Sequence, residues 1–431
     1  MLEHGMAKGE APAAAAEAAG APAPFAAVPA VVLGAGGYVG AELLRLIAGH
    51  PCLRLAAAVS GSLAGTPIAA AFPHLAAAYT GNCFAPADAL EAMLEAGEEE
   101  AARTPLAVFS ALPHGRSAPA VDGLLTAAAD AGRNLAVVDL SADFRHRDPE
   151  VYERLYGHPH PAPARLATFT CALPDLDPPP GAGGEPWHRL AAANGETAVA
   201  EPARPDAVAS FPPIAHPGCF TTAVVLAAAP LVALGLVEPR LAVTAVTGST
   251  GSGREPSAGT HHPDRHGDLR AYAPLTHRHR REMEALLARV TTRVELPGHA
   301  DAPTPATPSA PAQPPEVAFV PCSGPFARGI HATVSARLHA ALATAELASR
   351  LEGFYQGNPF VTVAQEPPRL KHVVGTNRCH LGVVAHGHEV VVLAVIDNLV
   401  KGAAGGAVQW MNRLLGLDER MGLDLPGLGW T

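Results

Sequence analysis

A glycine-rich loop between an apolar strand and an amphipathic helix is the feature that most restricts how this chain can fold. Residues Ala30–Leu33 predict a buried strand, and Val39–Ala48 predicts a helix with one apolar face. Glycines allow a tight turn and a close approach of the backbone to a pyrophosphate, which the helix N-terminus then binds. The pattern favours a dinucleotide-binding domain over an ordinary strand-to-helix turn. The residues predicted to contact the cofactor here are Gly34, Gly36, Gly37, Tyr38, Val39 and Gly40.

The end of the next predicted strand distinguishes between the two nicotinamide cofactors. Domains that bind NAD commonly place a carboxylate there, which holds the ribose 2′-hydroxyl. The segment Leu55–Ser62 offers hydroxyl groups and no carboxylate. It therefore predicts NADP(H), with Ser60 and Ser62 as phosphate contacts. The alternative is a plain turn, because small polar residues are common in turns.

Two further apolar segments, Leu106–Ala111 and Leu135–Leu140, predict more strands of the same parallel sheet. Ligands of such sheets bind beyond the carboxyl ends of the strands. We therefore expect Leu112 and Pro113 beside the nicotinamide half of the cofactor, and His114 in contact with the substrate. The alternative for His114 is that it only caps or holds a loop.

The tetrapeptide His216–Cys219 delivers a cysteine to the start of another predicted helix, which covers Thr221–Leu234. A Pro-Gly turn precedes the thiol. The unpaired N–H groups and the positive end of the helix dipole stabilise a thiolate at such a place. Cys219 is therefore predicted to be a nucleophile, and the alternative is a small buried residue that follows a turn.

A second loop rich in small residues follows a predicted strand at Val243–Val246. This loop, Thr247–Arg254, lacks the apolar helix that would follow it in a nucleotide-binding motif. Its last residue, Arg254, is a candidate partner for a substrate carboxylate or phosphate. The alternative is a flexible surface turn with a solvated arginine.

Two histidines further along the chain, His277 and His279, are candidate acid/base residues, and Glu282 is a candidate substrate contact. Because residues two apart cannot share one face of a helix, we expect at most one of the histidines to face Cys219. No matching third ligand accompanies the pair, so the sequence predicts no metal site.

The C-terminal region predicts a strand at Val390–Val395, followed by a segment rich in small residues, Ile396–Gln409. Small residues let a helix pack tightly against its neighbour. Together with Asn398 and Lys401, which we expect to contact the cofactor, they suit a helix that returns to the first domain.

Composition limits the partners that this chain can have. The 431 residues are 48% hydrophobic, which is enough for two domains. A formal net charge of -10 without a Lys/Arg-rich run argues against nucleic acid and against a membrane surface, so we expect a small-molecule substrate. The six cysteines show no CxxC pair, and the first residues resemble neither a secretory nor a transit signal, which together favour the cytoplasm.

Taken together, the motifs resemble the N-acetyl-γ-glutamyl-phosphate reductase family of the semialdehyde dehydrogenase superfamily. The resemblance runs from about Val31 to the C-terminus. It rests on Gly34–Arg45, Ala111–Gly115, Asp139–Arg145, His216–Cys219, His277–His279 and Ile396–Gly402. Its implied fold class is α/β: a Rossmann-type NADP-binding domain joined to an α+β domain that carries the catalytic centre and forms a homo-oligomer, either a dimer or a tetramer.

Domain limits follow from the same resemblance and from three Ala/Pro-rich tracts. We expect a disordered extension over residues 1–28 and Pro-rich insertions over 178–213 and 297–315. The NADP-binding domain is expected over 29–218 and the catalytic and oligomerisation domain over 219–395. The final segment, 396–431, is expected to carry the returning helix.

The activity that the resemblance implies is the NADPH-dependent reduction of N-acetyl-L-glutamyl 5-phosphate to N-acetyl-L-glutamate 5-semialdehyde, a step of arginine biosynthesis. It assigns the thiol nucleophile to Cys219, which forms a thioester, and the acid/base residue to His277 or His279. Two positions depart from the family pattern. Gly36 stands where a serine is usual, and Arg281 stands where a proline is usual, beside the histidine pair.

Two other functions compete with this one. A sister enzyme would reduce another acyl phosphate, such as aspartyl phosphate or an acyl group linked to a carrier protein, and would differ only in substrate preference. A redox sensor, in which Cys219 is oxidised rather than catalytic, would bind NADPH without turnover.

Overall fold

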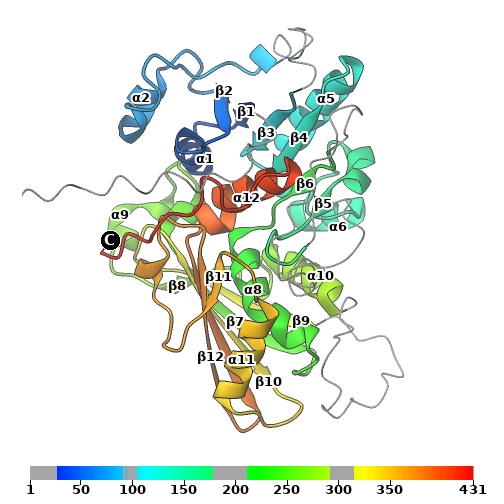
Figure 1. Ribbon diagram of the computed structural model, residues 1–431, viewed down its shortest axis with the longest axis vertical. Coiled ribbons are helices and arrows are strands. Elements are labelled where there is room, and N and C mark those ends of the chain that lie inside the picture. The colour runs from blue at the N-terminus through cyan, green and yellow to red at the C-terminus, as the bar shows by residue number, and fades with distance from the viewer. Residues whose placement is uncertain (1–26, 91–93, 95–103, 178–210, 292–314, 431) are drawn as a thin grey trace, which may run out of the picture.

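The computed structural model describes residues 27–90, 94, 104–177, 211–291 and 315–430. Two β-sheets lie one above the other, each with helices packed against it (Figure 1). The expected extension and both expected Pro-rich insertions fall almost entirely outside the described residues.

The first sheet has six parallel strands within the described residues, and the glycine-rich loop follows an interior strand, β1. Its order is β2 (Leu53–Val59), β1 (Val28–Leu33), β3 (Leu106–Ser110), β4 (Leu135–Asp139), β6 (Ile214–Ala215) and β5 (Thr170–Cys171). Alternate residues of β1 pack on opposite faces: Val32 lies in a cluster with α1 (Tyr38–Ala48) and α12 (Gly405–Leu414), and Val31 lies in one with α5 (Ser117–Asp130). A parallel sheet requires helices packed on both of its faces, and this sheet has them.

The second sheet is mixed and has seven strands in the described ranges. Its order is β11 (Val361–Val363), β12 (Cys379–His386), β13 (Glu389–Ile396), β10 (Ile330–Arg337), β7 (Arg240–Thr247), β9 (Glu316–Ser323) and β8 (Arg270–Ala271). Burial alternates along β7 and β10 because only one face is covered. The covering helices are α8 (Cys219–Ala233), α10 (His279–Thr291) and α11 (Thr344–Phe354).

Helix α8 is apolar on every side and almost wholly buried, as its sequence predicts. It begins at Cys219 itself, two residues before the expected start. The expected α/β fold class, a Rossmann-type domain joined to an α+β domain, is confirmed. The remaining described helices are short and lie near the surface: α2 (Ile68–Ala71), α6 (Pro149–Tyr156) and α9 (His262–Arg265).

The C-terminal segment after β13 returns to the first sheet. A π-helical turn, η6 (Val400–Ala404), leads into α12, and Trp410 of α12 donates a hydrogen bond from Nε1 to the carbonyl of Ala172 (3.0 Å). Small residues make this packing tight: a Cβ added at Gly402 would lie 2.7 Å from the Cβ of Cys219. The returning segment therefore forms one wall of the space around that cysteine.

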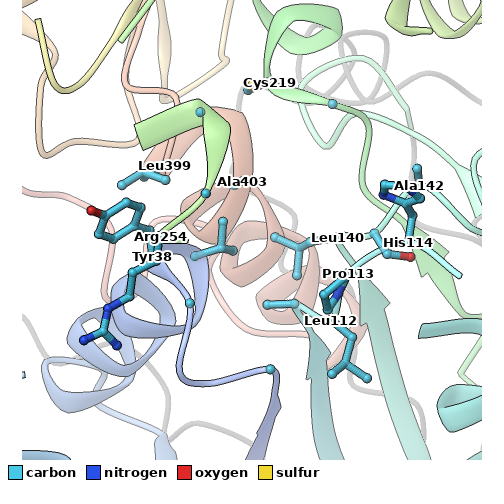
Figure 2. A pocket seen from close by; sticks show the side chains of 18 of the residues that line it. Tyr38, Leu112, Pro113, His114, Leu140, Ala142, Cys219, Arg254, Leu399 and Ala403 are labelled. Atoms are coloured by element: carbon cyan, nitrogen blue, oxygen red, sulfur yellow. The ribbon is translucent and has the colours of Figure 1, made fainter. Parts of the chain in front are cut away.

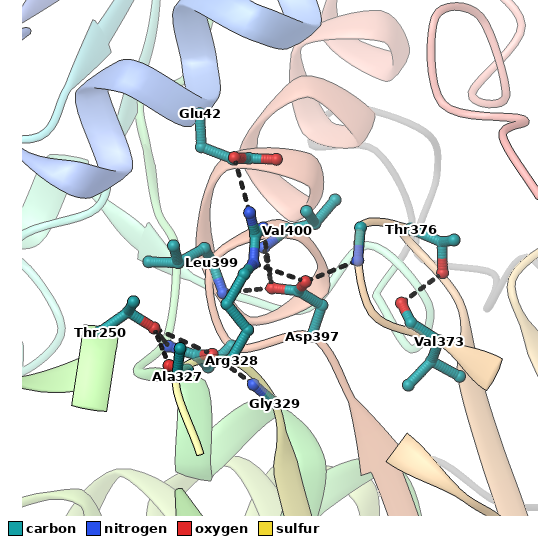
Figure 3. A network of polar contacts seen from close by, with 12 residues as sticks. Glu42, Thr250, Ala327, Arg328, Gly329, Val373, Thr376, Asp397, Leu399 and Val400 are labelled. Atoms are coloured by element: carbon teal, nitrogen blue, oxygen red, sulfur yellow. Dashed lines mark hydrogen bonds and ion pairs between the residues drawn. The ribbon is translucent and has the colours of Figure 1, made fainter. Parts of the chain in front are cut away.

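Arg328 joins the two halves of the molecule (Figure 3). Its Nη1 donates to Glu42 of α1 (3.2 Å), and its Nε donates to Asp397 at the end of β13 (3.0 Å). Asp397 also accepts hydrogen bonds from the backbone N–H groups of Gly375 and Leu399. The glycine loop, the second sheet and the returning segment are thus fixed relative to one another. Within the described ranges, no helix has the length and apolar character needed to cross a membrane.

Candidate active site

A cavity of about 780 Å³ opens between the first sheet and the start of α8 (Figure 2). Most of the residues predicted from the sequence line it: Gly34, Gly36, Gly37, Tyr38, Val39, Ser60, Ser62, Leu112, Pro113, His114, Cys219, Arg254, His279 and Asn398. Four predicted residues do not line it: Gly40, His277, Glu282 and Lys401. Residues far apart in the sequence therefore share one cavity, as expected for the carboxyl edge of a parallel sheet.

The glycine loop is shaped to receive a dinucleotide. Gly34 has a φ of +73°, and a Cβ added there would lie 2.6 Å from the carbonyl oxygen of Ala111. A Cβ added at Gly40 would lie 2.5 Å from the Cα of Ala35, so α1 packs directly on the loop. No side chain of the described residues caps the N-terminus of α1, and its first turn holds no acidic residue, which leaves its N–H groups available to a phosphate. The cradle fits a nicotinamide dinucleotide, and the hydride of the reduced form is the chemistry that this cofactor supplies.

Cys219 is the first residue of α8 and lies half-buried in the cavity wall. Gly218 forms the N-cap with extended backbone, and no side chain within the described ranges caps this helix start. The N–H groups of the first helical turn are therefore free to stabilise a developing oxyanion beside the thiol. Burial raises the pKa of Cys219 to about 11, although the Arg145 guanidinium and the backbone N–H of Phe220 act in the opposite direction.

Glu282 holds the turn that presents this cysteine. Its fully buried carboxylate accepts hydrogen bonds from the N–H of Gly218 and the hydroxyl of Thr221, both 2.9 Å long. It also accepts one from Nη1 of Arg145 (3.1 Å). Burial opposes the ionisation of Glu282, but the charge of Arg145 outweighs it and holds the pKa well below the ordinary range. Glu282 was expected to touch the substrate, whereas the structure places it behind the cavity wall, where it holds the turn before Cys219.

Only one of the two histidines reaches the cavity. The imidazole of His279 packs against the backbone of Gly218, where an added Cβ would lie 2.3 Å from Nε2. His277 lies behind it, edge-on to Phe220, and its Nδ1 accepts the backbone N–H of His279 (3.2 Å). The expectation that at most one histidine faces the cysteine agrees with this placement. Burial lowers the pKa of His279 to about 3 and that of His277 to about 4.

These shifts define the protonation state of the free site. At neutral pH the thiol of Cys219 and the imidazole of His279 are both neutral, while Glu282 and Arg145 are ionised. The sequence predicts a thiolate stabilised by the helix N-terminus, but in the structure the cost of burying a negative charge is larger. A nucleophilic attack by Cys219 would therefore require the thiol to lose its proton as the new bond forms.

Alkylation tests this state. Because only the thiolate reacts, the rate at which iodoacetamide modifies Cys219 should rise about tenfold per pH unit from neutrality toward the thiol pKa of about 11. Mass spectrometry of the peptide that contains Cys219 gives the rate, with the exposed Cys83 as an internal reference for the reagent. A rate that levels off near the ordinary thiol pKa of about 8.5 would show that burial does not raise the pKa, and a rate that is already level at neutral pH would show that the site holds a thiolate.

The structure places one of the two predicted C-terminal residues, Lys401, away from the cavity. Lys401 is 1% exposed, and its Nζ forms an ion pair with Asp175 (2.6 Å) and donates to Gln409 (3.0 Å), so it does not line the cavity. Asn398 lines the cavity, but its amide is bonded to Thr250 and to the N–H of Gly329. Both residues hold the framework of the site.

Three arginines that the sequence reasoning did not select also line the cavity: Arg116, Arg145 and Arg278. The signal for Arg145 is present in the sequence, since it lies in the turn after a predicted strand. Its Nε donates to the carbonyl of His216 and its Nη2 to that of Leu140. Among the described lining residues, Glu255 is the one carboxylate, so the cavity is cationic although the whole chain carries a formal charge of -10.

A dinucleotide cradle and a cysteine at a helix start, brought to one cavity, define an oxidoreductase that uses a nicotinamide cofactor. The chain belongs to the semialdehyde dehydrogenase family: residues 29–179 match the family's NAD-binding domain, and residues 219–398 match its dimerisation domain. The resemblance seen in the motifs is thereby confirmed.

Relatives and solved structures agree with this membership. An N-acetyl-γ-glutamyl-phosphate reductase of Dehalococcoides mccartyi is 35% identical over 90% of this chain and 94% of its own length. A protein of Thermomicrobium roseum, named as a reductase of LysW-linked L-2-aminoadipate 6-phosphate, is 34% identical over 93% of this chain and 99% of its own length. The aspartate semialdehyde dehydrogenase of Candida albicans, solved with NADP, shares the fold with a TM-score of 0.55 at 18% identity, over 90% of this chain and 98% of that one.

Proposed function

We propose that this protein reduces N-acetyl-L-glutamyl 5-phosphate to N-acetyl-L-glutamate 5-semialdehyde and phosphate, with NADPH as reductant, in cytoplasmic arginine biosynthesis. The observation that carries the proposal is the thiol of Cys219 at the uncapped start of α8, in the same cavity as the glycine cradle. Relatives about one-third identical over nine-tenths of the chain bear the name of this activity.

The chemistry follows from the residues around Cys219. Its sulfur attacks the acyl carbonyl, His279 accepts the thiol proton, and the N–H groups at the start of α8 stabilise the oxyanion. The bond to the phosphate oxygen breaks, phosphate leaves, and a thioester remains on Cys219. Hydride addition to the thioester carbonyl gives a hemithioacetal, which takes up a proton and collapses to the aldehyde and the free thiol.

A cationic cavity favours an acyl phosphate as the substrate. Arg145 is fixed by two carbonyls and by Glu282, so its charge is held in place before the substrate arrives. Arg278 also lines the cavity. Preorganised positive charge stabilises a phosphate group and its departure without a cost of reorganisation.

Assay of the reverse reaction tests this proposal. NADPH formation is followed with NADP⁺, phosphate and one of three aldehydes: N-acetyl-L-glutamate 5-semialdehyde, aspartate semialdehyde or LysW-linked 2-aminoadipate 6-semialdehyde. We expect the acetylated compound to react fastest. A preference for the LysW-linked aldehyde would support the second candidate function, which the relative from T. roseum favours. Cofactor binding without turnover of any aldehyde would contradict the enzymatic proposal and support the redox sensor.

The two histidines should respond differently to substitution. His279→Asn should lower kcat by about 10²–10⁴-fold, because the cavity loses its acid/base group. His277→Asn should have a smaller effect, because His277 contacts the backbone of His279 rather than the cavity. Steady-state kinetics of both variants give the comparison. Equal losses of kcat, or a larger loss in His277→Asn, would contradict the assignment of His279 as the acid/base residue.

The open face of the second sheet supports a homo-oligomer. Helices cover one face of this sheet, and along β7 the residues of the other face, such as Ala242 and Thr244, remain exposed. This sheet lies within the region that matches the family's dimerisation domain. We propose that a second copy of the chain packs on this face.

A further inference from the structure

Arg254 reaches from the second half of the chain to the cofactor cradle. It follows the short turn after β7, yet its Nη1 donates to the carbonyl of Gly36 in the glycine loop (2.9 Å). Its guanidinium also stacks on the ring of Phe72, 4.9 Å from the centroid. In Figure 2 it lies beside Tyr38, at the opposite end of the cavity from Pro113 and His114. The sequence-based expectation of a substrate contact does not agree with this position.

The end of the cavity that Arg254 occupies is the one beside β2. Ser60 and Ser62 follow β2 and line the same cavity, and a Cβ added at Gly36 would lie 2.8 Å from the hydroxyl oxygen of Ser60. In dinucleotide-binding sheets the end of this strand holds the ribose of the adenosine. A guanidinium and two hydroxyl groups therefore gather where the 2′-position of that ribose would lie.

Arg254 is available to bind an anion. Within the described part of the chain its guanidinium forms no ion pair, and the neighbouring Glu255 is exposed and not bonded to it. The loop that carries it is anchored, since Thr250 donates to the carbonyl of Ala327 (2.7 Å) and accepts from Asn398 (3.0 Å). An arginine held by a stacked ring and an anchored loop presents its remaining N–H groups to a phosphate with little loss of entropy.

We propose that Arg254 binds the 2′-phosphate of the cofactor, together with Ser60 and Ser62, and so determines the preference for NADP(H) over NAD(H). This inference rests on the NADP(H) assignment in the proposed function and adds the residue responsible for it. Because that residue comes from the loop after β7, cofactor specificity depends on both halves of the chain.

Binding of NADP⁺ and NAD⁺, measured by calorimetry without substrate, tests the inference, because the two ligands differ only by the 2′-phosphate. In Arg254→Gln the affinity for NADP⁺ should fall about 10- to 100-fold, as expected for a lost charged hydrogen bond, and the affinity for NAD⁺ should change little. The affinity of Arg254→Lys for NADP⁺ should lie between those of the wild-type protein and Arg254→Gln. Arg350→Gln removes the same charge from α11, far from the cradle, and should leave both affinities unchanged.

The outcomes separate this inference from the proposed function. A native-like thermal unfolding curve for Arg254→Gln excludes a folding defect. If the wild-type protein prefers NADP⁺ and Arg254→Gln keeps the full preference, the role of Arg254 is refuted while the NADP(H) assignment stands. If the wild-type protein shows no preference, both fail, and the reduction of the acyl phosphate is still judged separately by the aldehyde assay.

Discussion

Replacement of Cys219 by serine should lower the rate of the reaction by roughly 10³-fold or more. The serine hydroxyl forms far less anion near neutral pH than a thiol, and an oxygen ester would replace the more reactive thioester. His279 cannot compensate, because a serine hydroxyl is a far weaker acid than the thiol whose proton His279 accepts in the proposed mechanism. Steady-state rates in both directions measure the loss.

Two controls make this result specific to Cys219. The exposed Cys83, replaced by serine, should leave the rates unchanged, because it lies outside the cavity. Binding of NADP⁺ to Cys219→Ser should match the wild-type protein, since the cradle is formed by other residues. A Cys219→Ser enzyme that keeps more than about a tenth of the activity would refute covalent catalysis.

Replacement of Lys401 by methionine should destabilise the fold by about 3–5 kcal/mol. The substitution leaves the buried carboxylate of Asp175 without the cation that lies 2.6 Å from it. Urea unfolding measures the change in the free energy of unfolding. Because Lys401 is adjacent to Gly402, which packs on Cys219, the catalytic rate should also fall.

A double variant isolates the ion pair from general damage to packing. In Lys401→Met combined with Asp175→Leu, both members of the ion pair are replaced by apolar side chains, so much of the lost stability should return. Lys401→Met on its own should be the less stable of the two variants. If Lys401→Met lowers the free energy of unfolding by less than about 1 kcal/mol, the ion pair of Lys401 and Asp175 does not hold the returning segment in place.

Features set by short-range sequence patterns could be predicted. The apolar run before Gly34 and the helix after it identify the cradle, because strand, turn and helix propensities act over a few residues. The same holds for the long apolar helix that begins at Cys219. From these two features, the dinucleotide fold and the place of the cysteine follow.

Features set by long-range packing could not be predicted. Lys401 pairs with Asp175, 226 residues away in the sequence, and no local pattern marks that partner. Arg254 turns toward Gly36 because the loop after β7 is anchored on Ala327, in the loop before β10, and on Asn398 of the returning segment. The pKa of Cys219 also escaped prediction, since the helix N-terminus is visible in the sequence but the burial of the thiol is not.

The most direct test of the central claim, a covalent thioester on Cys219, is a rapid-mixing measurement without phosphate. The enzyme is mixed with NADP⁺ and N-acetyl-L-glutamate 5-semialdehyde, so that the hemithioacetal on Cys219 can lose its hydride but no phosphate is present to release the acyl group. We predict a burst of one NADPH per active site, which then stops and resumes when phosphate is added. Phosphate-dependent turnover with no burst, or an equal burst in Cys219→Ser, would contradict the account.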